Sequence, residues 1–174
     1  MMFTLKSPAF QDGGKIPEKY TEGSKISPPL SWADLPKGTG SLALAITDPD
    51  VPAAFGLPRI LVHWMVYNIP SSVTSLAEGV SPSGKLPSGA KELNNDTATF
   101  KLPGFYDKGY WGPFPPDAAH RYIFTLYALK APSITIPERA DYVEFVKAVL
   151  PQTITTATLI GYYGPAKSPI PTGK

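Results

Sequence analysis

In the segment Arg121-Tyr122-Ile123-Phe124-Thr125-Leu126-Tyr127-Ala128-Leu129, aromatic and β-branched residues dominate. Such residues fit the pleated, half-buried surface of a sheet, so the segment predicts a buried strand. His120 stands at its start, and Ala131-Pro132 closes it, because proline cannot donate to the hydrogen-bond ladder of a sheet.

Two earlier segments also predict buried strands. The first, Leu42-Ala43-Leu44-Ala45-Ile46, ends at the turn signal Asp48-Pro49-Asp50, and the second runs from Ile60 to Ile69 and stops at Pro70. The 21 prolines and 15 glycines among 174 residues are spread along the chain, which favours short strands joined by fixed turns. We therefore expect a mainly β protein. Weaker strand candidates are residues 2–10, 97–102 and 156–163.

One helix is expected between Pro137 and Pro151. Proline suits the first position of a helix, where its missing N–H would have no partner in any case. The apolar residues between the two prolines recur at spacings of three and four, which is typical of a helix packed on a core.

The length of 174 residues indicates one domain, which we place at residues 1–163. Residues 164–174 are expected to be a flexible tail. The long loops 53–59, 81–95 and 103–119 are expected to be functional or mobile, as loops of this length usually are.

Charge and cysteine content exclude several classes of function. Lys and Arg number 16 against 14 Asp and Glu, and no basic stripe stands out, so we expect no nucleic-acid partner. The absence of cysteine excludes disulfides, thiolate zinc sites and cysteine nucleophiles.

The N-terminal segment has no basic region followed by an apolar run, so it is not expected to be a secretory signal. The apolar stretches are far shorter than the roughly 20 residues that span a bilayer. No basic amphipathic helix is evident either. We therefore expect a soluble, cytoplasmic protein without stable membrane insertion.

The chain has two histidines, His63 and His120, and both fall in or beside predicted strands. A single histidine among apolar neighbours is more often a core residue than a ligand. Two of two in such places favour a functional role. Strand alternation predicts that His120 and Tyr122 share a face, and that His63 points away from Trp64.

An acidic turn, Asp48-Pro49-Asp50-Val51-Pro52, follows the predicted strand 42–46. Asp and Pro are ordinary turn residues. However, a charged carboxylate beside a buried strand end is costly unless it has a partner. A histidine N–H is the expected partner of Asp48.

The loop Gly112-Pro113-Phe114-Pro115-Pro116 is dense in proline, which makes it rigid and poor in donors. It can be read as a plain connector. Alternatively, the amide of Gly112 remains as a donor, with no side chain to hinder an approaching ligand.

Several motifs occur together in one order, and each is quoted as it stands here: Ser27-Pro28-Pro29-Leu30-Ser31-Trp32, Asp48-Pro49-Asp50-Val51-Pro52, His63-Trp64 with Asn68-Ile69-Pro70, Gly112-Pro113-Phe114-Pro115-Pro116, and His120-Arg121-Tyr122 with Leu126-Tyr127-Ala128-Leu129. Together they resemble the phosphatidylethanolamine-binding protein family, also called the Raf kinase inhibitor protein family, in its bacterial and archaeal branch. The resemblance covers about residues 5–163.

This resemblance implies a central antiparallel sheet packed on a smaller sheet, with a few short helices at the periphery. It also implies a small pocket that binds anions such as phosphate or a phospholipid headgroup. The implied pocket residues are Asp48, His63, Gly112, Pro113, His120 and Tyr122. The residues taken as supporting the pocket are Asp50, Pro52, Trp64 and Arg121.

Three positions depart from the family pattern. Phe114 stands where branch members often have Cys, and Ala118-Ala119 replaces a frequent glycine before His120. The stretch 57–62 replaces the more usual aromatic approach to His63. These departures change the rim of the implied pocket and remove none of the implied anion-binding groups.

We expect this pocket to bind an anion without a catalytic step or a cofactor. The Tyr122 hydroxyl, the Gly112 amide and one or both imidazoles would donate to the anion, while Asp48 would fix the tautomer of an imidazole. Such charge-assisted bonds contribute about 1.5 to 3 kcal/mol each, which predicts a millimolar-to-micromolar ligand.

Two alternatives stay open. A metal-dependent hydrolase could use Asp48, His63 and His120 as ligands, although no short metal-binding spacing occurs and no metal is expected. The pocket could also bind phosphorylated groups of a protein partner and so modulate that partner. From the resemblance a homodimer is plausible as well.

Overall fold

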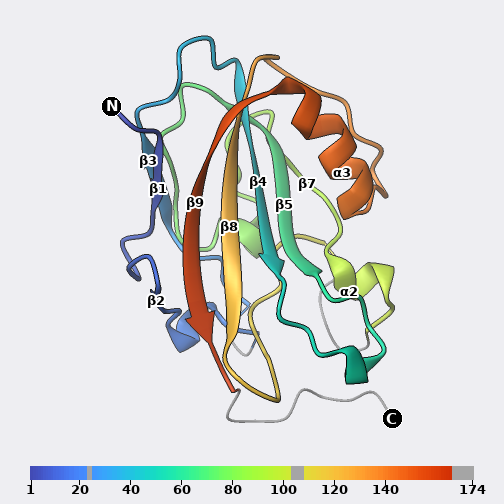
Figure 1. Ribbon diagram of the computed structural model, residues 1–174. Helices are drawn as coiled ribbons and strands as arrows, with labels where there is room; N and C mark the ends of the chain where they lie inside the picture. Colours follow the sequence, from blue (N-terminus) through green and yellow to red (C-terminus); the bar gives the residue numbers. More distant parts are fainter. Residues whose placement is uncertain (23–24, 103–107, 166–174) are drawn as a thin grey trace.

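The computed structural model describes residues 1–22, 25–102 and 108–165. Its centre is a six-stranded sheet in the order β2-β9-β8-β4-β5-β7. The strands pair antiparallel except β2, which runs parallel to β9 (Figure 1). The bounds of these strands are β2 Gly14–Lys15, β4 Ser41–Asp48, β5 Leu61–Pro70, β7 Lys91–Glu92, β8 His120–Leu129 and β9 Thr153–Tyr163. The strands expected at 42–46, 60–69, 121–129 and 156–163 are thus confirmed, with ends shifted by a few residues.

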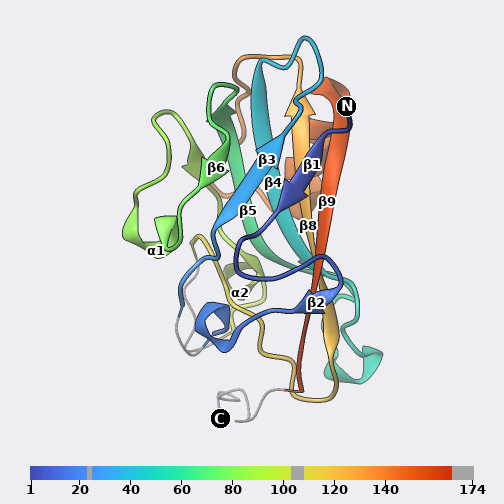
Figure 2. The same ribbon diagram turned by 90° about the vertical axis from the view of Figure 1, so that its left-hand side faces the viewer.

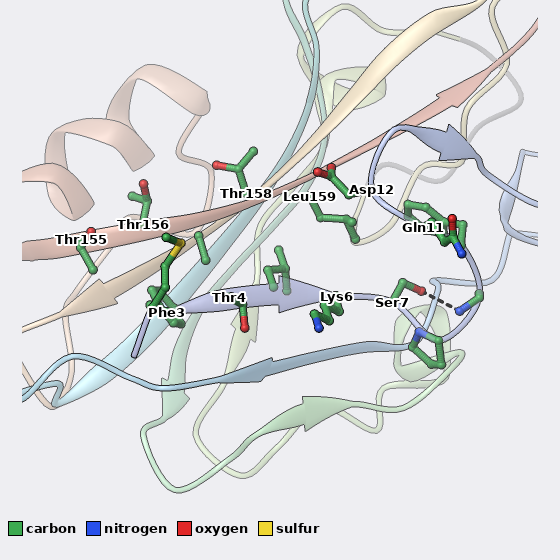
Figure 3. A pocket seen from close by; sticks show the side chains of 16 residues that line it. Phe3, Thr4, Lys6, Ser7, Gln11, Asp12, Thr155, Thr156, Thr158 and Leu159 are labelled. Carbon is green, nitrogen blue, oxygen red and sulfur yellow. Dashed lines mark hydrogen bonds between the residues drawn. The ribbon is translucent and has the colours of Figure 1, made fainter.

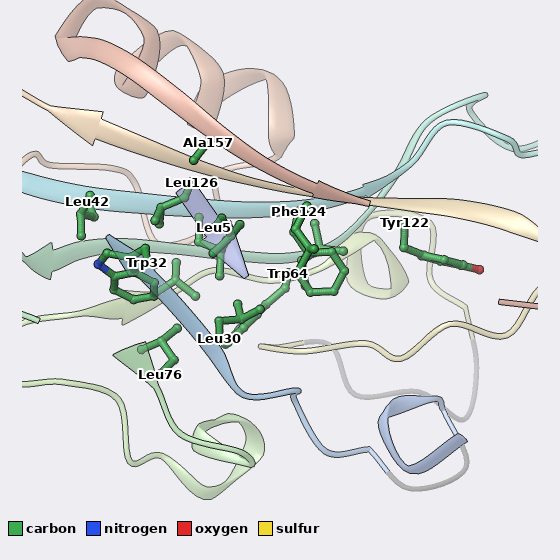
Figure 4. Packing of buried hydrophobic residues seen from close by; sticks show 14 of the residues in the cluster. Leu5, Leu30, Trp32, Leu42, Trp64, Leu76, Tyr122, Phe124, Leu126 and Ala157 are labelled. Atoms are coloured by element: carbon green, nitrogen blue, oxygen red, sulfur yellow. The ribbon is translucent and has the colours of Figure 1, made fainter. Parts of the chain in front are cut away.

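A second sheet of three short strands packs against one face of the first (Figure 2). It consists of β1 (Thr4–Lys6), β3 (Leu30–Ala33) and β6 (Ser75–Leu76), all antiparallel. The main apolar core lies between the two sheets, with Trp64 and Phe124 fully buried in it (Figure 4). The mainly β fold with a small second sheet is confirmed.

The helix α3 (Tyr142–Val149) covers part of the opposite face of the large sheet. Its Phe145 is fully buried and packs with Met65 and Tyr67 of β5 in a second apolar cluster. The predicted helix is confirmed, but its start is not at Pro137. Asp141 caps it instead, by a reciprocal pair of hydrogen bonds with Glu144 that satisfies two of the free N–H groups at the helix start.

The weak strand candidate at 97–102 is wrong, because residues Asp96–Thr99 form the short helix α2. The side chain of Asn95 accepts from the Thr97 N–H, and this cap supports a helical turn. The other short helices are α1 (Val80–Ser83), η1 (Glu18–Tyr20), η2 (Ala53–Phe55) and η3 (Leu150–Gln152). The loops expected at 53–59 and 81–95 therefore contain η2 and β7. Residues 103–107 and 166–174, which include most of the expected tail, lie outside the described residues.

A β-bulge at His63 changes which way this side chain points. Ile46 pairs with Trp64 and Thr47 pairs with Val62, so His63 is one extra residue on β5. Two adjacent residues at a bulge can face the same side of a sheet. The predicted alternation is therefore wrong here: the His63 ring meets Tyr122 on the face that holds Trp64, whereas Met65 lies on the other face.

Candidate functional site

The candidate site lies at one end of the large sheet, where β4 ends and β8 begins (Figure 1). Antiparallel pairing of Thr47 with Ile123 brings Asp48 level with Tyr122. Tyr122 lies at the edge of the main core, and its hydroxyl points away from the apolar cluster (Figure 4). The sheet itself thus brings together polar groups that are more than 70 residues apart in sequence.

His120 is held between two carboxylates. Its Nδ1 lies 2.7 Å from Oδ2 of Asp48, and its Nε2 lies 2.9 Å from Oδ1 of Asp117. The histidine is 3% exposed. Since an ionised carboxylate can only accept, both ring nitrogens donate when both acids are ionised, which is the charged imidazolium form. The histidine partner expected for Asp48 is therefore His120.

His63 has different hydrogen-bond partners. Its Nδ1 lies 2.8 Å from the carbonyl oxygen of Trp111 and donates to it, while the Trp111 N–H donates back to the His63 carbonyl at 2.8 Å. The two rings stack with centroids 4.1 Å apart. Burial lowers the pKa of His63 to about 4, so the ring is neutral near pH 7.

This bonding pattern fixes the tautomer of His63. With the proton on Nδ1, the Nε2 atom carries a lone pair and is an acceptor. Nε2 is buried and has no hydrogen-bond partner within the described part of the chain. A buried acceptor without a partner is costly, and native proteins rarely keep one without a reason.

Tyr122 remains a donor over the whole physiological range. Its burial, together with the nearby charge of Asp48, raises the pKa of the phenol well above its usual value. The edge of its ring meets His63 at a centroid distance of 5.1 Å. The backbone of Phe114 acts on the pKa of Tyr122 in the opposite direction, so the proline-rich loop lies beside this hydroxyl.

The loop at Gly112 is fixed from two sides. Trp111 pairs with His63, and the Pro113 carbonyl accepts from the N–H of Glu22 at 3.3 Å. A Cβ built on Gly112 would lie 2.3 Å from the carbonyl carbon of Thr21. The backbone of Thr21–Glu22 therefore leaves no room for a side chain at this position.

The residues expected to support the pocket occupy different places. Asp50 donates its N–H to Oδ1 of Asp48 at 2.8 Å and holds Arg121 through its side chain. Pro52 precedes η2. Trp64 lies in the core, where its Nε1 donates to Glu92 at 2.8 Å. Asp50 and Arg121 thus lie next to the Asp48–His120 pair in sequence, and Trp64 packs in the core against Tyr110.

Two site residues were missed by sequence reasoning, Asp117 and Trp111. Asp117 stands three residues before His120, outside any strand, so only the path of the loop brings its carboxylate to the ring. Trp111 precedes the glycine that drew attention to this loop. The sequence signals that could have indicated them were an acidic residue shortly before the His120 motif and an aromatic residue directly before Gly112.

The three residues named for the alternative metal site, Asp48, His63 and His120, do not form an open set of donors. Both nitrogens of His120 and the Nδ1 of His63 are already engaged. Within the ranges that the structure describes, no group of three His, Asp or Glu side chains has an arrangement that could hold a metal ion.

A separate groove of about 890 Å³ lies between β1 and β9 (Figure 3). Threonines of β9, from Thr155 to Thr158, line one side, and Thr4 and Lys6 of β1 line the other. These threonines pair with the far end of β8, around Thr125 to Ala128, whereas His120 pairs with Tyr163. The groove is therefore distinct from the histidine site.

The sequence pattern of the phosphatidylethanolamine-binding protein family matches residues 6–164. The chain belongs to the phosphatidylethanolamine-binding protein family. A UPF0098 protein of Methanothermobacter thermautotrophicus is 40% identical over 160 residues, which cover 91% of this chain and 97% of the relative.

Solved structures of bacterial family members have the same fold. The homologue CT736 from Chlamydia trachomatis superposes with a TM-score of 0.79 at 37% identity, covering 93% of this chain and 97% of that one. YbcL from Escherichia coli, described as a member of the mammalian family, also gives 0.79, at 28% identity, covering 94% and 98%. The expected family and branch are confirmed.

No helix among the described residues is long and apolar enough to cross a membrane. One family relative, LppC of Mycobacterium tuberculosis, is named as a lipoprotein; it is 34% identical over 166 residues, which cover 92% of this chain and 71% of that protein.

Proposed function

We propose that this protein binds a small oxyanion of the phosphate class at His120 and Tyr122, without a catalytic step. One observation carries the proposal: the buried ring of His120, backed by Asp48, holds an oxyanion oxygen on Nε2 at 2.9 Å, supplied in this structure by Asp117. A donor that holds one carboxylate oxygen can hold the oxygen of an external anion in the same way.

Asp48 supports this donor and is not itself a ligand. Its Oδ2 accepts from Nδ1 of His120, and the oxygen of Asp117 on Nε2 is held by the second ring proton. Its Oδ1 is taken by the Asp50 N–H. Both carboxylate oxygens are thus occupied, and their charge would repel an anion placed directly against them.

The donors available to the anion come from different elements. They are Nε2 of His120, the hydroxyl of Tyr122 and, in this proposal, the amide of Gly112. Charge-assisted hydrogen bonds contribute about 1.5 to 3 kcal/mol each. One such bond and one or two neutral ones correspond to a millimolar-to-micromolar affinity. A weak, exchanging ligand of this kind suits a protein that senses or carries phosphate groups, including those on a partner protein.

His63 contributes an acceptor and not a donor, which narrows the ligand. The lone pair on Nε2 repels a fully deprotonated oxyanion but accepts from one that keeps a proton. Hydrogen phosphate carries such a proton near neutral pH, and sulfate does not. The proposed ligand is therefore a phosphate that keeps a proton, either the free ion or a monoester in its singly charged form, in preference to the phosphodiester of an intact phospholipid.

Calorimetric titration with inorganic phosphate near pH 7 tests the proposal. We expect saturable binding of one phosphate per chain in the millimolar-to-micromolar range, weakened at least tenfold by His120→Asn and severalfold by Tyr122→Phe. The exposed Asp34→Asn serves as a control for altered charge away from the site. Absence of binding, or equal binding by wild type, His120→Asn and Tyr122→Phe, would overturn the proposal. Parallel titrations with glycerol 3-phosphate and dimethyl phosphate distinguish a monoester from a diester.

A further inference from the structure

The two carboxylates on His120 are held differently. Asp48 lies on β4 with a side chain that is 5% exposed, and both its oxygens have partners. Asp117 lies in a loop with a side chain that is 32% exposed. Within the described residues, the bond to His120 is the one hydrogen bond recorded for the Asp117 side chain. Asp48 is therefore built into the sheet, whereas Asp117 can be exchanged.

We propose that Asp117 is an internal ligand of the anion site, so that an external anion binds by displacing its carboxylate from Nε2 of His120. This inference rests on the proposed function, because it assigns to Asp117 the place that the bound phosphate takes. Asp117 then lowers the affinity of the site for external anions. In this structure the site is occupied by the protein's own carboxylate.

The exchange requires only a side-chain rotation. The backbone next to Asp117 is packed tightly: a Cβ built on Gly164 would come within 2.5 Å of both the Ala118 carbonyl oxygen and the Pro115 ring. The Asp117 carboxylate is at the protein surface and can turn to water, where it is fully solvated. His120 and Asp48 stay in place and present the same donor to the incoming anion.

An internal competitor lowers the apparent affinity for every external anion by the same factor. When the binding-competent form is a fraction of the population, the apparent dissociation constant rises by the inverse of that fraction, whatever the ligand is. Removing Asp117 should therefore increase the affinity for phosphate and for acetate equally. A factor of about ten corresponds to 1.4 kcal/mol, a modest value for one charge-assisted hydrogen bond.

Two other roles for Asp117 give different results. If Asp117 only repelled anions by its charge, then its removal would favour doubly charged phosphate more than singly charged acetate. Asp117→Asn and Asp117→Ala would also behave alike. If Asp117 supported binding by keeping His120 charged, then both substitutions would weaken binding. The competitor role predicts that Asp117→Asn is intermediate, because its amide oxygen still accepts from Nε2 but in a weaker, neutral bond.

The experiment is a calorimetric titration of wild type, Asp117→Ala, Asp117→Asn and the control Asp34→Asn with inorganic phosphate and with acetate. We expect Asp117→Ala to bind both anions about tenfold more tightly than wild type, Asp117→Asn to fall between them, and Asp34→Asn to match wild type. Equal or weaker binding by Asp117→Ala, or a gain seen with phosphate alone, would overturn this inference while leaving the proposed function intact. Absence of binding to wild type and to both Asp117 variants would overturn the proposed function and this inference together.

Discussion

Arg121 and Asp50 form a two-pronged ion pair that joins the start of β8 to the turn after β4. Nη2 of Arg121 lies 2.7 Å from Oδ1 of Asp50, and its Nε lies 3.0 Å from Oδ2. The backbone N–H of Arg121 also donates to Oδ2 at 2.8 Å. These three bonds join the turn that follows Asp48 to the residue that follows His120. Asp50, which also donates its N–H to Asp48, thus helps to hold Asp48 beside His120.

Substitution Asp50→Asn should destabilise the protein in a pH-dependent way. Bonding to Arg121 lowers the pKa of Asp50 below its ordinary 3.8. A carboxyl with a lowered native pKa stabilises the fold above its unfolded pKa, and this contribution is lost as pH falls through the native value. The melting temperature of Asp50→Asn should be below that of wild type at pH 7, and the difference should shrink as pH falls below 3.8. A constant difference across this range would contradict the assignment.

The neutral state of His63 predicts a loss of stability on acidification. Its pKa is lowered from 6.5 to about 4 in the fold, so between these values the unfolded chain binds more protons than the native protein. Stability therefore falls as pH decreases through this window, by about 2 kcal/mol at pH 5 for this group alone.

The variant His63→Phe keeps an aromatic ring on Trp111 and removes this titration. Denaturant unfolding of both proteins at pH 7.5 and pH 5 measures the effect. Wild type should lose more stability than His63→Phe between the two pH values. Equal losses would show that His63 is not buried and neutral.

The acceptor on His63 predicts discrimination between phosphate and sulfate near pH 7. The two anions have the same shape, but only phosphate brings a proton for the lone pair on Nε2. We expect wild type to bind phosphate at least tenfold more tightly than sulfate. In His63→Phe the two affinities should differ by less than about threefold, because the lone pair is gone. Wild type that binds both anions equally would refute the acceptor role.

Substitution Gly112→Ala should weaken phosphate binding as well as the fold. The new methyl group would meet the backbone of Thr21 at 2.3 Å, so the loop must move away from its place beside His63. Forcing extra atoms into a packed interior typically costs about 1–3 kcal/mol. Gly84→Ala is the matched control: its Cβ meets no atom within 4 Å, but its φ of +74° makes it costly too. Only Gly112→Ala should reduce phosphate affinity in a titration at matched temperature.

The long strands of the large sheet were predictable because they consist of long runs of apolar and β-branched residues, as in 121–129. The small sheet was predictable only in part. Its strand β1 falls within the candidate 2–10, but β6 has two residues and β3 four, too few to establish a period. The weak strand at 97–102 failed because the cap from Asn95 stabilises a helical turn that its threonines alone do not indicate.

One contact of the site was predictable: a carboxylate at the end of a buried strand needs a hydrogen-bond donor, so Asp48 was expected to pair with a histidine. The direction of His63 was not, because a bulge depends on the pairing of two strands and not on either one alone. The contact of Asp117 with His120 was not predictable either. It depends on the path of a loop, which short-range sequence does not determine.

The most direct test of the account is a crystal structure of the wild-type protein soaked in phosphate near neutral pH. We predict a tetrahedral anion within hydrogen-bond distance of Nε2 of His120 and the hydroxyl of Tyr122, with the Asp117 carboxylate turned out to solvent. A saturated crystal in which Asp117 still occupies Nε2 of His120, and no anion lies beside Tyr122, would contradict it.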